Sequence, residues 1–166
     1  PVWTSTLSVP ELTDGVVGLR LWRAADVPAI VAACQDPEIP RWTLVPEPYT
    51  ADDARLWLAT HSPGLRSGRR VELAVVEADD EDAVLGSVAL VRHPTADDRA
   101  EVGYWMAATA RGRGVATRAV QLSTAWGFEA LGVQRIELLA EPGNQASQRV
   151  AERAGFVRER ILRRHR

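Results

Sequence analysis

Arg111-Gly112-Arg113-Gly114-Val115-Ala116 is the most informative stretch of this sequence. It follows an extended apolar segment, residues 102–106, and leads into a long helical pattern. Two glycines at a strand-to-helix turn let the backbone approach a ligand closely, and the first amides of a helix have no intrahelical partner. These amides and the helix dipole favour an anion, and Arg111 and Arg113 add positive charge. The stretch therefore predicts a phosphate-binding loop, with an ordinary tight turn as the alternative.

Two common phosphate loops do not fit the residues that follow. A Walker A loop needs Gly-Lys-Ser/Thr, whereas Val115, Ala116 and Thr117 follow Gly114 here. A dinucleotide fingerprint needs a small residue where Thr117 stands and a carboxylate closing the next strand, but Glu137 falls inside its expected strand. These residues exclude both the Walker A loop and the dinucleotide fingerprint.

The hexapeptide instead resembles the Arg/Gln-x-x-Gly-x-Gly/Ala signature of the GCN5-related N-acetyltransferases (GNAT), with Arg111, Gly114 and Ala116 at its defining positions. In that family the signature holds the pyrophosphate of coenzyme A. From about Val84 to Ile161 the chain is similar to the RimJ/RimL branch of ribosomal-protein N-terminal acetyltransferases. The matching pieces, in family order, are residues 85–88, 100–106, 111–116, 135–138 and 144–156.

The resemblance implies the α/β (α+β) GNAT fold: a mixed, mostly antiparallel sheet, splayed between its fourth and fifth strands and flanked by about four helices. Coenzyme A occupies the notch and the acceptor enters from the other side. The implied activity is direct transfer of an acetyl group from acetyl-CoA to a primary amine. Family members usually carry one more strand after the equivalent of Arg163, so we expect the final strand of the fold to be missing here.

Bulk properties restrict the class of protein and its partners. The 166 residues predict one domain over 1–166, and a net charge of −2 with a pI near 6.0 indicates no nucleic-acid or membrane partner. The single cysteine, Cys34, fits a reducing cytoplasm. His61, His93 and His165 lack ligand spacing, so no metal is expected.

Periodicity and turn residues predict an alternation of strands and helices. Strands are expected over residues 16–22, 71–76, 84–91, 99–106 and 135–140 and from 156 onward, and helices from 27, over 50–58, from 115 and over 144–154. The proline-rich stretch 37–48 reads as a loop. Glu101 and Trp105 fall on the strand face opposite Val102 and Tyr104.

The resemblance implies residues for the donor. The expected coenzyme contacts are the strand edge at Met106 and Ala107, the loop and helix start at Arg111, Gly112, Arg113, Gly114, Val115, Ala116 and Thr117, and Asn144. The amides of 113–117 would hold the pyrophosphate and the strand edge the pantetheine arm. Asn144 is also a good helix N-cap.

Two residues are candidates for the chemistry. Glu101 stands where many family members place a carboxylate, and we expect it to act as general base; a structural pair with Arg92 or Arg99 is the alternative. Ser147, in the Asn-x-x-Ser motif, is expected to protonate the leaving thiolate, as the resemblance implies, or simply to satisfy a free amide in the first helical turn.

The acceptor side is less specified. Trp42 and Trp57 flank the proline-rich loop and are expected to line the acceptor pocket, with plain core packing as the alternative. The acceptor is expected to be a protein N-terminus or a small amine. A non-catalytic coenzyme A-binding module and a succinyl-CoA-using enzyme remain alternatives, and the branch often forms homodimers.

Overall fold

The computed structural model describes residues 7–162 and contains a six-stranded sheet in the order of the chain. The strands are β1 (Leu12–Thr13), β2 (Val17–Leu21), β3 (Arg70–Glu77), β4 (Asp80–His93), β5 (Ala96–Met106) and β6 (Arg135–Glu137). Neighbours from β1 to β5 are antiparallel, whereas β6 runs parallel to β5. The sheet is therefore mixed and mostly antiparallel, as predicted.

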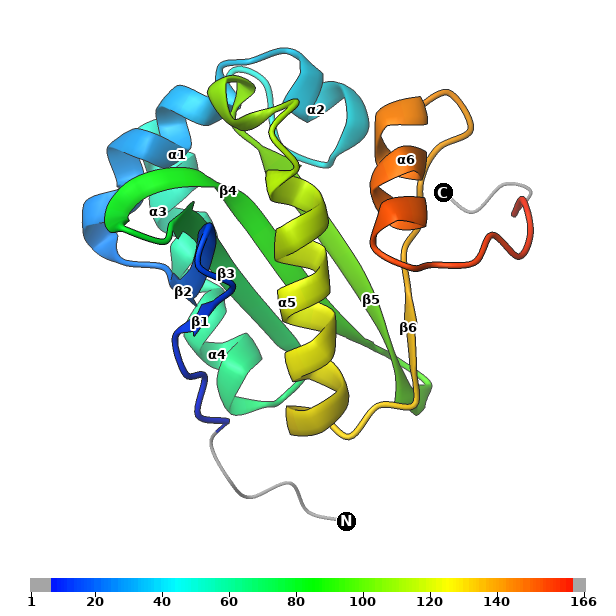
Figure 1. Cartoon of the computed structure of the whole chain (residues 1–166). Helices are drawn as coiled ribbons and strands as arrows, with labels where there is room; N and C mark the ends of the chain where they lie inside the picture. Colours follow the sequence, from blue (N-terminus) through cyan, green and yellow to red (C-terminus); the bar gives the residue numbers. More distant parts are fainter. Residues whose placement is uncertain (1–6, 163–166) are drawn as a thin grey trace.

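Helices cover both faces of the sheet (Figure 1). The α-helices are α1 (Val27–Cys34), α2 (Glu38–Trp42), α3 (Ala51–Ala59), α4 (His61–Arg66), α5 (Val115–Ala130) and α6 (Gln145–Arg153), with 3-10 turns η1 (Ala24–Asp26) and η2 (Ala108–Ala110). Helices α1, α3, α5 and α6 were predicted; the short α2 and α4 were not. Pro37 immediately precedes α2, where proline is compatible with a helix start, so the loop prediction for 37–48 was wrong there.

Helix α5 lies across one face of the sheet and forms the main core (Figure 1). It begins after Gly114 and ends before Gly132, both in the left-handed region with φ near +75° and +62°. Its buried residues Val115, Ala119 and Val120 meet apolar residues of β2 to β5, among them Leu90 and Val102. Burying a Leu or Val side chain contributes about 1.5–3 kcal/mol, so this layer dominates stability.

A second, smaller core covers the opposite face, under α1 and α3. Ile30, Cys34 and Ala54 are buried there against Trp57 and Trp105. Thr50 caps α3 by accepting from the amide of Asp53 at 3.2 Å, and the Asp53 carboxylate accepts in turn from the Thr50 amide. This reciprocal cap sets where α3 starts and so where Trp57 lies.

A buried ion pair ties β2 to the start of α1. The guanidinium of Arg20 donates to both carboxylate oxygens of Asp26 at 2.9 Å, and the two side chains are 4% and 7% exposed. The Asp26 carboxylate also accepts from the Arg23 amide at 2.8 Å, and this bond stabilises the turn before α1. Burial opposes the charged form of Asp26, but these bonds outweigh it and hold its pKa below the usual value.

The sheet opens between β5 and β6. The two strands pair only where Arg99–Glu101 face Arg135–Glu137, while β5 continues to Met106. With the short β1 counted, these are the fifth and sixth strands, and they match the splay predicted between the fourth and fifth strands of the family fold. Strand β6 was expected to reach Ala140 but ends at Glu137, where the chain leaves β5 for α6.

The strand predicted from Phe156 does not form through Leu162. A strand needs a neighbour to receive its main-chain bonds, and β6 is only three residues long, so its outer edge offers few such bonds to this segment within the described residues. The Arg135 guanidinium instead donates to the Glu159 carboxylate, and the longer of these two contacts is 3.0 Å.

No helix within residues 7–162 has the length and apolar character to cross a bilayer.

Candidate active site

The predicted phosphate loop lies between β5 and α5. Gly112 and Gly114 have φ of +72° and +75°, a conformation that favours glycine, and a Cβ added at either would meet nothing within 4 Å. Gly114 is also the N-cap of α5, and having no side chain it leaves the first-turn amides uncovered. The loop therefore has the space and the donors that a pyrophosphate requires.

The two loop arginines form ion pairs with neighbouring carboxylates. Arg111 donates to Asp36 at 2.9 Å and to the Met106 carbonyl at 3.0 Å, and Arg113 donates to Glu77 at 2.6 Å. Both guanidinium groups are partly exposed, at 37% and 46%. They brace the loop against the turn that follows α1 and against the end of β3, and the main-chain amides are the better placed anion donors.

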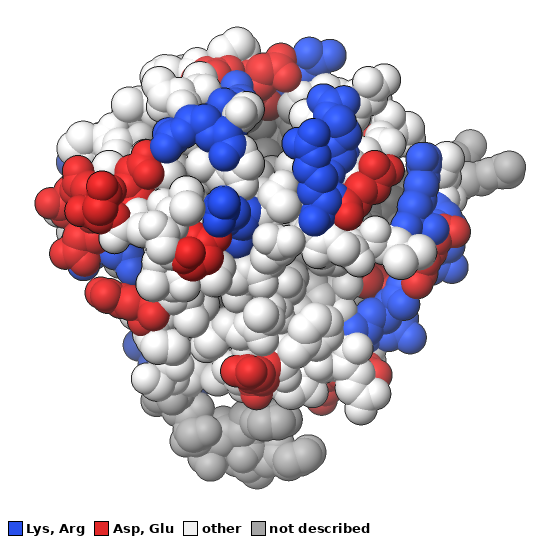
Figure 2. Space-filling view, in the orientation of Figure 1, with Lys and Arg blue, Asp and Glu red and all other residues white. Residues whose placement is uncertain are grey.

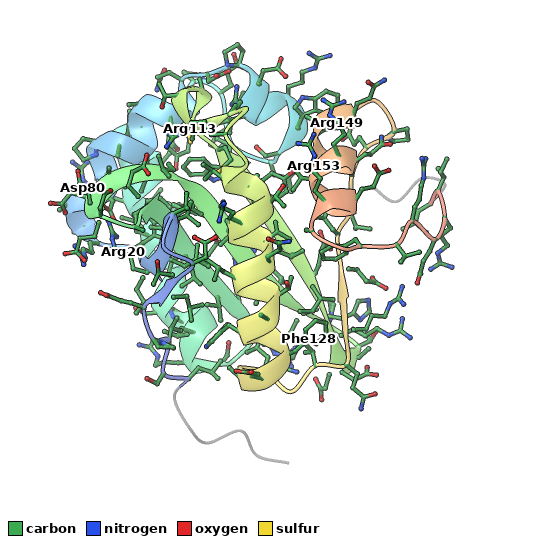
Figure 3. The ribbon with its side chains drawn as sticks, in the orientation of Figure 1. Arg20, Asp80, Arg113, Phe128, Arg149 and Arg153 are labelled. Atoms are coloured by element: carbon green, nitrogen blue, oxygen red, sulfur yellow. The ribbon has the colours of Figure 1, made fainter. Side chains whose placement is uncertain are left out.

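Sequence reasoning missed two further arginines near the loop. Arg149 and Arg153 are exposed on α6, four residues apart and therefore on one helix face. Helix α6 packs along α5, where Gln121 donates to the Arg153 carbonyl at 3.5 Å. Figure 3 places both arginines beside the N-terminal half of α5, and Figure 2 shows basic side chains gathered there while the surface further along α5 is largely uncharged. These charges suit a polyanion at the helix start.

The strand edge predicted for the pantetheine arm is partly used within the protein. The Ala107 amide donates to the Leu85 carbonyl at 2.8 Å, and the Met106 carbonyl receives Arg111. β5 nevertheless runs past the end of β6, so the stretch before Met106 faces the gap between the two strands. A strand-like ligand would fit at this gap.

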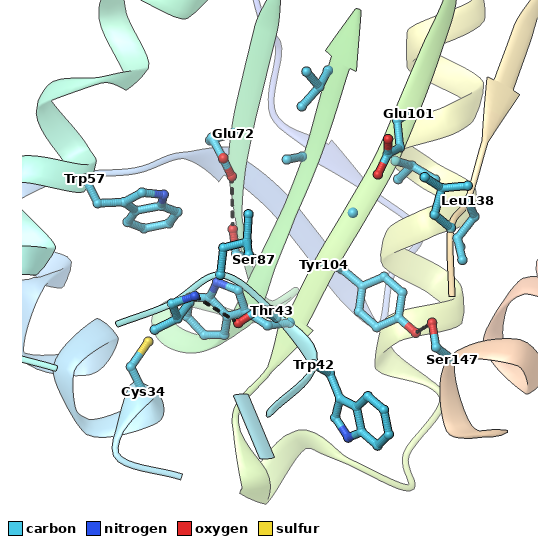
Figure 4. Close-up of a pocket in the computed structure, with 18 of the residues that line it drawn as sticks. Cys34, Trp42, Thr43, Trp57, Glu72, Ser87, Glu101, Tyr104, Leu138 and Ser147 are labelled. Atoms are coloured by element: carbon cyan, nitrogen blue, oxygen red, sulfur yellow. Dashed lines mark hydrogen bonds between the residues drawn. The ribbon is translucent and has the colours of Figure 1, made fainter. Parts of the chain in front are cut away.

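A cavity of about 610 Å³ opens on the sheet face opposite α5 (Figure 4). Its floor is the register row of Glu72, Ala89 and Gly103 on β3, β4 and β5. Its walls come from α3, residues 42–49 and the segment between β6 and α6. Chemistry-bearing side chains from several parts of the chain meet here, and they include both predicted catalytic residues.

Glu101 lies in this cavity on the face predicted for it, one residue from the buried Val102. It stands in the register row of Val91 and Arg70, and the residue is exposed. Arg92 donates to the carbonyls of Gly68 and Leu131, and the structural pairing of Glu101 with Arg92 or Arg99 stays the alternative to the catalytic role. The placement is compatible with a base that reaches an incoming amine; the catalytic role stays a prediction.

Ser147 also lines the cavity, and it has a partner that sequence reasoning missed. The Tyr104 hydroxyl donates to Ser147 Oγ at 3.0 Å (Figure 4). Burial raises the pKa of Tyr104, so the phenol remains protonated near neutral pH. Alternation had placed Tyr104 on the core face, but a buried tyrosine hydroxyl usually has a partner, and that was the signal available.

Asn144 caps α6 as predicted. Its side-chain oxygen accepts from the Ser147 amide at 3.1 Å, which fixes the first turn of the helix and the place of the serine hydroxyl. Both residues line the cavity. The cap and the proposed ligand role remain compatible, because the amide group has several hydrogen-bonding sites.

Glu72 is a further cavity residue that sequence reasoning overlooked. It is 5% exposed and is the third residue of β3. Arg70 Nε donates to its Oε1 at 2.8 Å, and Ser87 Oγ lies 3.4 Å from Oε2. Burial raises the pKa of Glu72, against the smaller opposing effect of Arg70. A glutamate within the apolar run of residues 71–76 was the signal, since carboxylates are rarely buried without a partner.

The two predicted tryptophans both line the cavity. Trp57 packs at the centre of an aromatic group, with ring centroids 5.3 Å from Trp22 and 6.4 Å from Trp105. Trp42 lies on the opposite side, where its indole donates to Glu38 at 3.0 Å. The two expected roles of these tryptophans, lining the cavity and packing against neighbours, are therefore compatible. Their contact with a substrate stays a prediction.

Within residues 7–162, the remaining titratable groups give no sign of a metal or thiol site. In that part of the chain no three His, Cys, Asp or Glu side chains are grouped to hold a metal ion, and His165 lies outside the described residues. Cys34 lines the cavity, but burial raises the pKa of its thiol to about 11, so it is protonated at neutral pH.

Comparison with known proteins assigns the family. Residues 17–157 match the model of the acetyltransferase (GNAT) domain, and the chain belongs to this family. The Bacillus subtilis protein YdaF, a putative ribosomal N-acetyltransferase, is 33% identical over 79 residues, which make up 48% of this chain and 43% of YdaF. The chain thus aligns with less than half the length of that relative.

Solved structures agree on the fold. Mycobacterium smegmatis RimJ, solved in complex with CoA-disulfide, superposes with a TM-score of 0.78 at 25% identity, covering 98% of this chain and 80% of RimJ. RimL, a ribosomal L7/L12 alpha-N-protein acetyltransferase solved with coenzyme A, gives 0.81 at 18% identity, with 95% and 89% covered. The predicted family resemblance is confirmed.

Proposed function

We propose that this chain transfers an acetyl group from acetyl-CoA to a primary amine, by direct transfer in a ternary complex. The observation that carries the proposal is the course of β5. This strand brings Glu101 and Tyr104 into the cavity and then leads into the glycine loop at the start of α5. The proposed donor and acceptor sites therefore meet along one strand.

The cavity residues supply the proton transfers that the reaction needs. Glu101, directly or through a water, takes a proton from the acceptor ammonium. The neutral nitrogen attacks the thioester carbonyl carbon, and as the tetrahedral intermediate collapses the C–S bond breaks and the Ser147 hydroxyl donates a proton to the departing sulfur. The nitrogen releases its second proton to water, and a proton from solvent returns to Ser147 through Tyr104, whose hydroxyl donates to Ser147. An α-amino acceptor, with a pKa near 8, is already about one-tenth neutral at pH 7 and needs little help from a base.

The donor would be held by the main-chain amides of residues 113–117, with Asn144 beside the pantetheine arm. The open space at Gly112 and Gly114 supports this, because a bound pyrophosphate must approach the backbone there. Arg149 and Arg153 add charge for the remaining phosphate. Acetyl is the proposed acyl group and succinyl is the alternative. The affinities for acetyl-CoA and succinyl-CoA distinguish the two.

The acceptor class follows from the cavity and the relatives. A chamber of about 610 Å³ suits a small amine or the first residues of a peptide. RimL is by name an acetyltransferase of a protein α-amino group, which supports a protein N-terminus as one candidate. A cytoplasmic location is part of the proposal, since a reducing compartment keeps Cys34 as a thiol.

Calorimetric titration with coenzyme A, acetyl-CoA and succinyl-CoA tests the donor site. Gly114→Glu would place a carboxylate where the pyrophosphate is proposed, and we expect at least a hundredfold loss of affinity. Gly132→Glu is the matched control, since Gly132 has a similar φ and equally open surroundings at the other end of α5. Native-like binding by Gly114→Glu, or equal losses in both variants, would contradict the loop as the donor site.

A further inference from the structure

The cavity has an uneven charge balance that the transfer chemistry does not require. Among the described residues, its lining includes a single basic side chain, Arg70, and four acidic ones, at positions 53, 72, 101 and 141. The whole chain, by contrast, is close to neutral, with a net charge of −2 over 166 residues. An acidic, partly enclosed chamber attracts cations and disfavours anionic acceptors.

Glu72 is the deepest of these charges. Arg70 donates to Oε1 through two nitrogens, whereas Oε2 has the long 3.4 Å contact from Ser87. A carboxylate offers about four acceptor positions, so Oε2 keeps capacity for a stronger donor. Burial raises the pKa of Glu72, which means that Arg70 does not fully offset the loss of water. An additional cationic donor at Oε2 would relieve this deficit.

Aromatic rings line the same cavity as the carboxylate. Ser87, which contacts Glu72, is paired in register with Trp105, and the Trp105 ring is 6.4 Å from that of Trp57. Both tryptophans line the cavity, and Figure 4 shows Trp57 on the same side as Glu72. A cavity that holds both a carboxylate and indole rings is a favourable environment for an alkylammonium group, through charge pairing and cation–π attraction.

The floor of the cavity sets the distance between Glu72 and the proposed reaction centre at Glu101. Glu72, Ala89 and Gly103 form one row across three strands, so about 10 Å separates the backbone at Glu72 from that of β5. The side chains between are small, and a Cβ at Gly103 would meet nothing within 4 Å. A linear methylene chain can lie along this row, with one end at Glu72 and the other near Glu101.

We propose that Glu72 binds a second cationic group of the acceptor, and that the enzyme acetylates small aliphatic diamines or polyamines at their other amine. This inference rests on the proposed acetyl transfer. It names Glu72 as the residue that selects the substrate class, while Glu101 acts at the amine that reacts and Ser147 at the leaving thiolate.

Three acceptors with a six-carbon chain test the selection: 1,6-diaminohexane, hexylamine and 6-aminohexanoate. We expect kcat/KM for the diamine to exceed that for hexylamine by about 10- to 100-fold, as for one charge-assisted bond, with the aminohexanoate lowest. Glu72→Gln should reduce the diamine preference at least tenfold, and Glu72→Asp should retain part of it. Glu101→Gln should slow both amines and leave their ratio unchanged. A native enzyme without the preference, or a preference that survives Glu72→Gln, would overturn the proposal.

A binding measurement separates this inference from the proposed function. Trp57 and Trp105 should report diaminohexane through their fluorescence in the absence of any acyl donor, and Glu72→Gln should weaken that binding while leaving acetyl-CoA affinity and Tm close to native. Absence of transfer to every amine would contradict the proposed function alone, provided the diamine still binds through Glu72. Equal diamine binding by native protein and Glu72→Gln, or none by the native protein, would overturn the inference whatever the turnover.

Discussion

The two faces of the central sheet differ in what they bury. Under α5 the sheet presents apolar side chains such as Leu90 and Val102, and the buried Ser123 hydroxyl of the helix donates to the Val120 carbonyl. The opposite face buries Glu72, and in the layer against it two ring nitrogens, Trp22 Nε1 and His61 Nε2, have no hydrogen-bond partner among the described residues. The first face is built for stability. The second carries polar groups at a cost in stability, as functional surfaces commonly do.

Adjacent residues on β4 give the sharpest test of that contrast. Leu90→Ala should lower the free energy of unfolding by about 2–5 kcal/mol, because it opens a cavity under α5. Val91 is next in sequence but faces the chamber and is half-buried, so Val91→Ala should cost less than about 1.5 kcal/mol. Urea denaturation of both variants measures the difference. Equal losses would show that the two faces contribute alike.

Removing the proposed base should affect activity without affecting stability. We expect Glu101→Gln to reduce kcat about 100-fold with an amine of high pKa, and less with an α-amino acceptor that is partly neutral already. Coenzyme affinity and Tm should remain close to native, because the residue is exposed. Undiminished kcat with both acceptors would remove Glu101 as the base.

His61 should make the stability depend on pH. Burial, together with the nearby charge of Arg70, lowers the pKa of His61 from 6.5 to about 4. The unfolded chain therefore binds the proton more readily between these values. The contribution of His61 is full above pH 6.5 and is lost as pH falls toward 4, by about 2–3 kcal/mol.

The comparison that isolates this effect is the pH profile of urea unfolding for native protein and His61→Phe. The phenyl ring keeps an aromatic partner for Trp57, which lies 4.5 Å from the imidazole, and removes the titration. Between pH 6.5 and 4 the variant should lose less stability than the native protein. Parallel profiles would mean that His61 is not held neutral by the fold.

Adding one methyl group at either of two sheet glycines tests the same contrast, because the two positions differ in the space around them. A Cβ at Gly86 would lie 2.3 Å from the Trp105 carbonyl oxygen, which is main chain and cannot move aside, so Gly86→Ala should cost about 1–3 kcal/mol. A Cβ at Gly103 would enter the chamber, so Gly103→Ala should leave Tm nearly unchanged or raise it slightly. Thermal unfolding of the two variants measures this contrast, and a large loss for Gly103→Ala would contradict an open chamber floor.

The sequence predicted features that depend on neighbours along the chain. The glycine loop, the stripe of α5, the Thr50–Asp53 start of α3 and the Asn144 cap are all local, and all appear in the structure. Glu101 could be assigned to the correct face because strand alternation is also local. These are the parts of the site that one sequence can specify.

What sequence reasoning missed depends on register and on distant partners. Glu72 enters the site only because β3 pairs with β4 so that Ser87 and Ala89 lie beside it. Tyr104 meets Ser147 across 43 residues, at a helix start whose position the sheet determines. The strand expected from Phe156 failed for the same kind of reason, since local propensity does not supply a neighbouring strand long enough to pair with.

A crystal structure with coenzyme A would show whether the start of α5 holds the donor while the opposite face of the sheet holds the acceptor. We expect the pyrophosphate on the amides of residues 113–117, with the thiol passing through the gap between β5 and β6 to within hydrogen-bonding reach of Ser147. Coenzyme bound with its pyrophosphate in the chamber beside Glu72, or away from the start of α5, would contradict it.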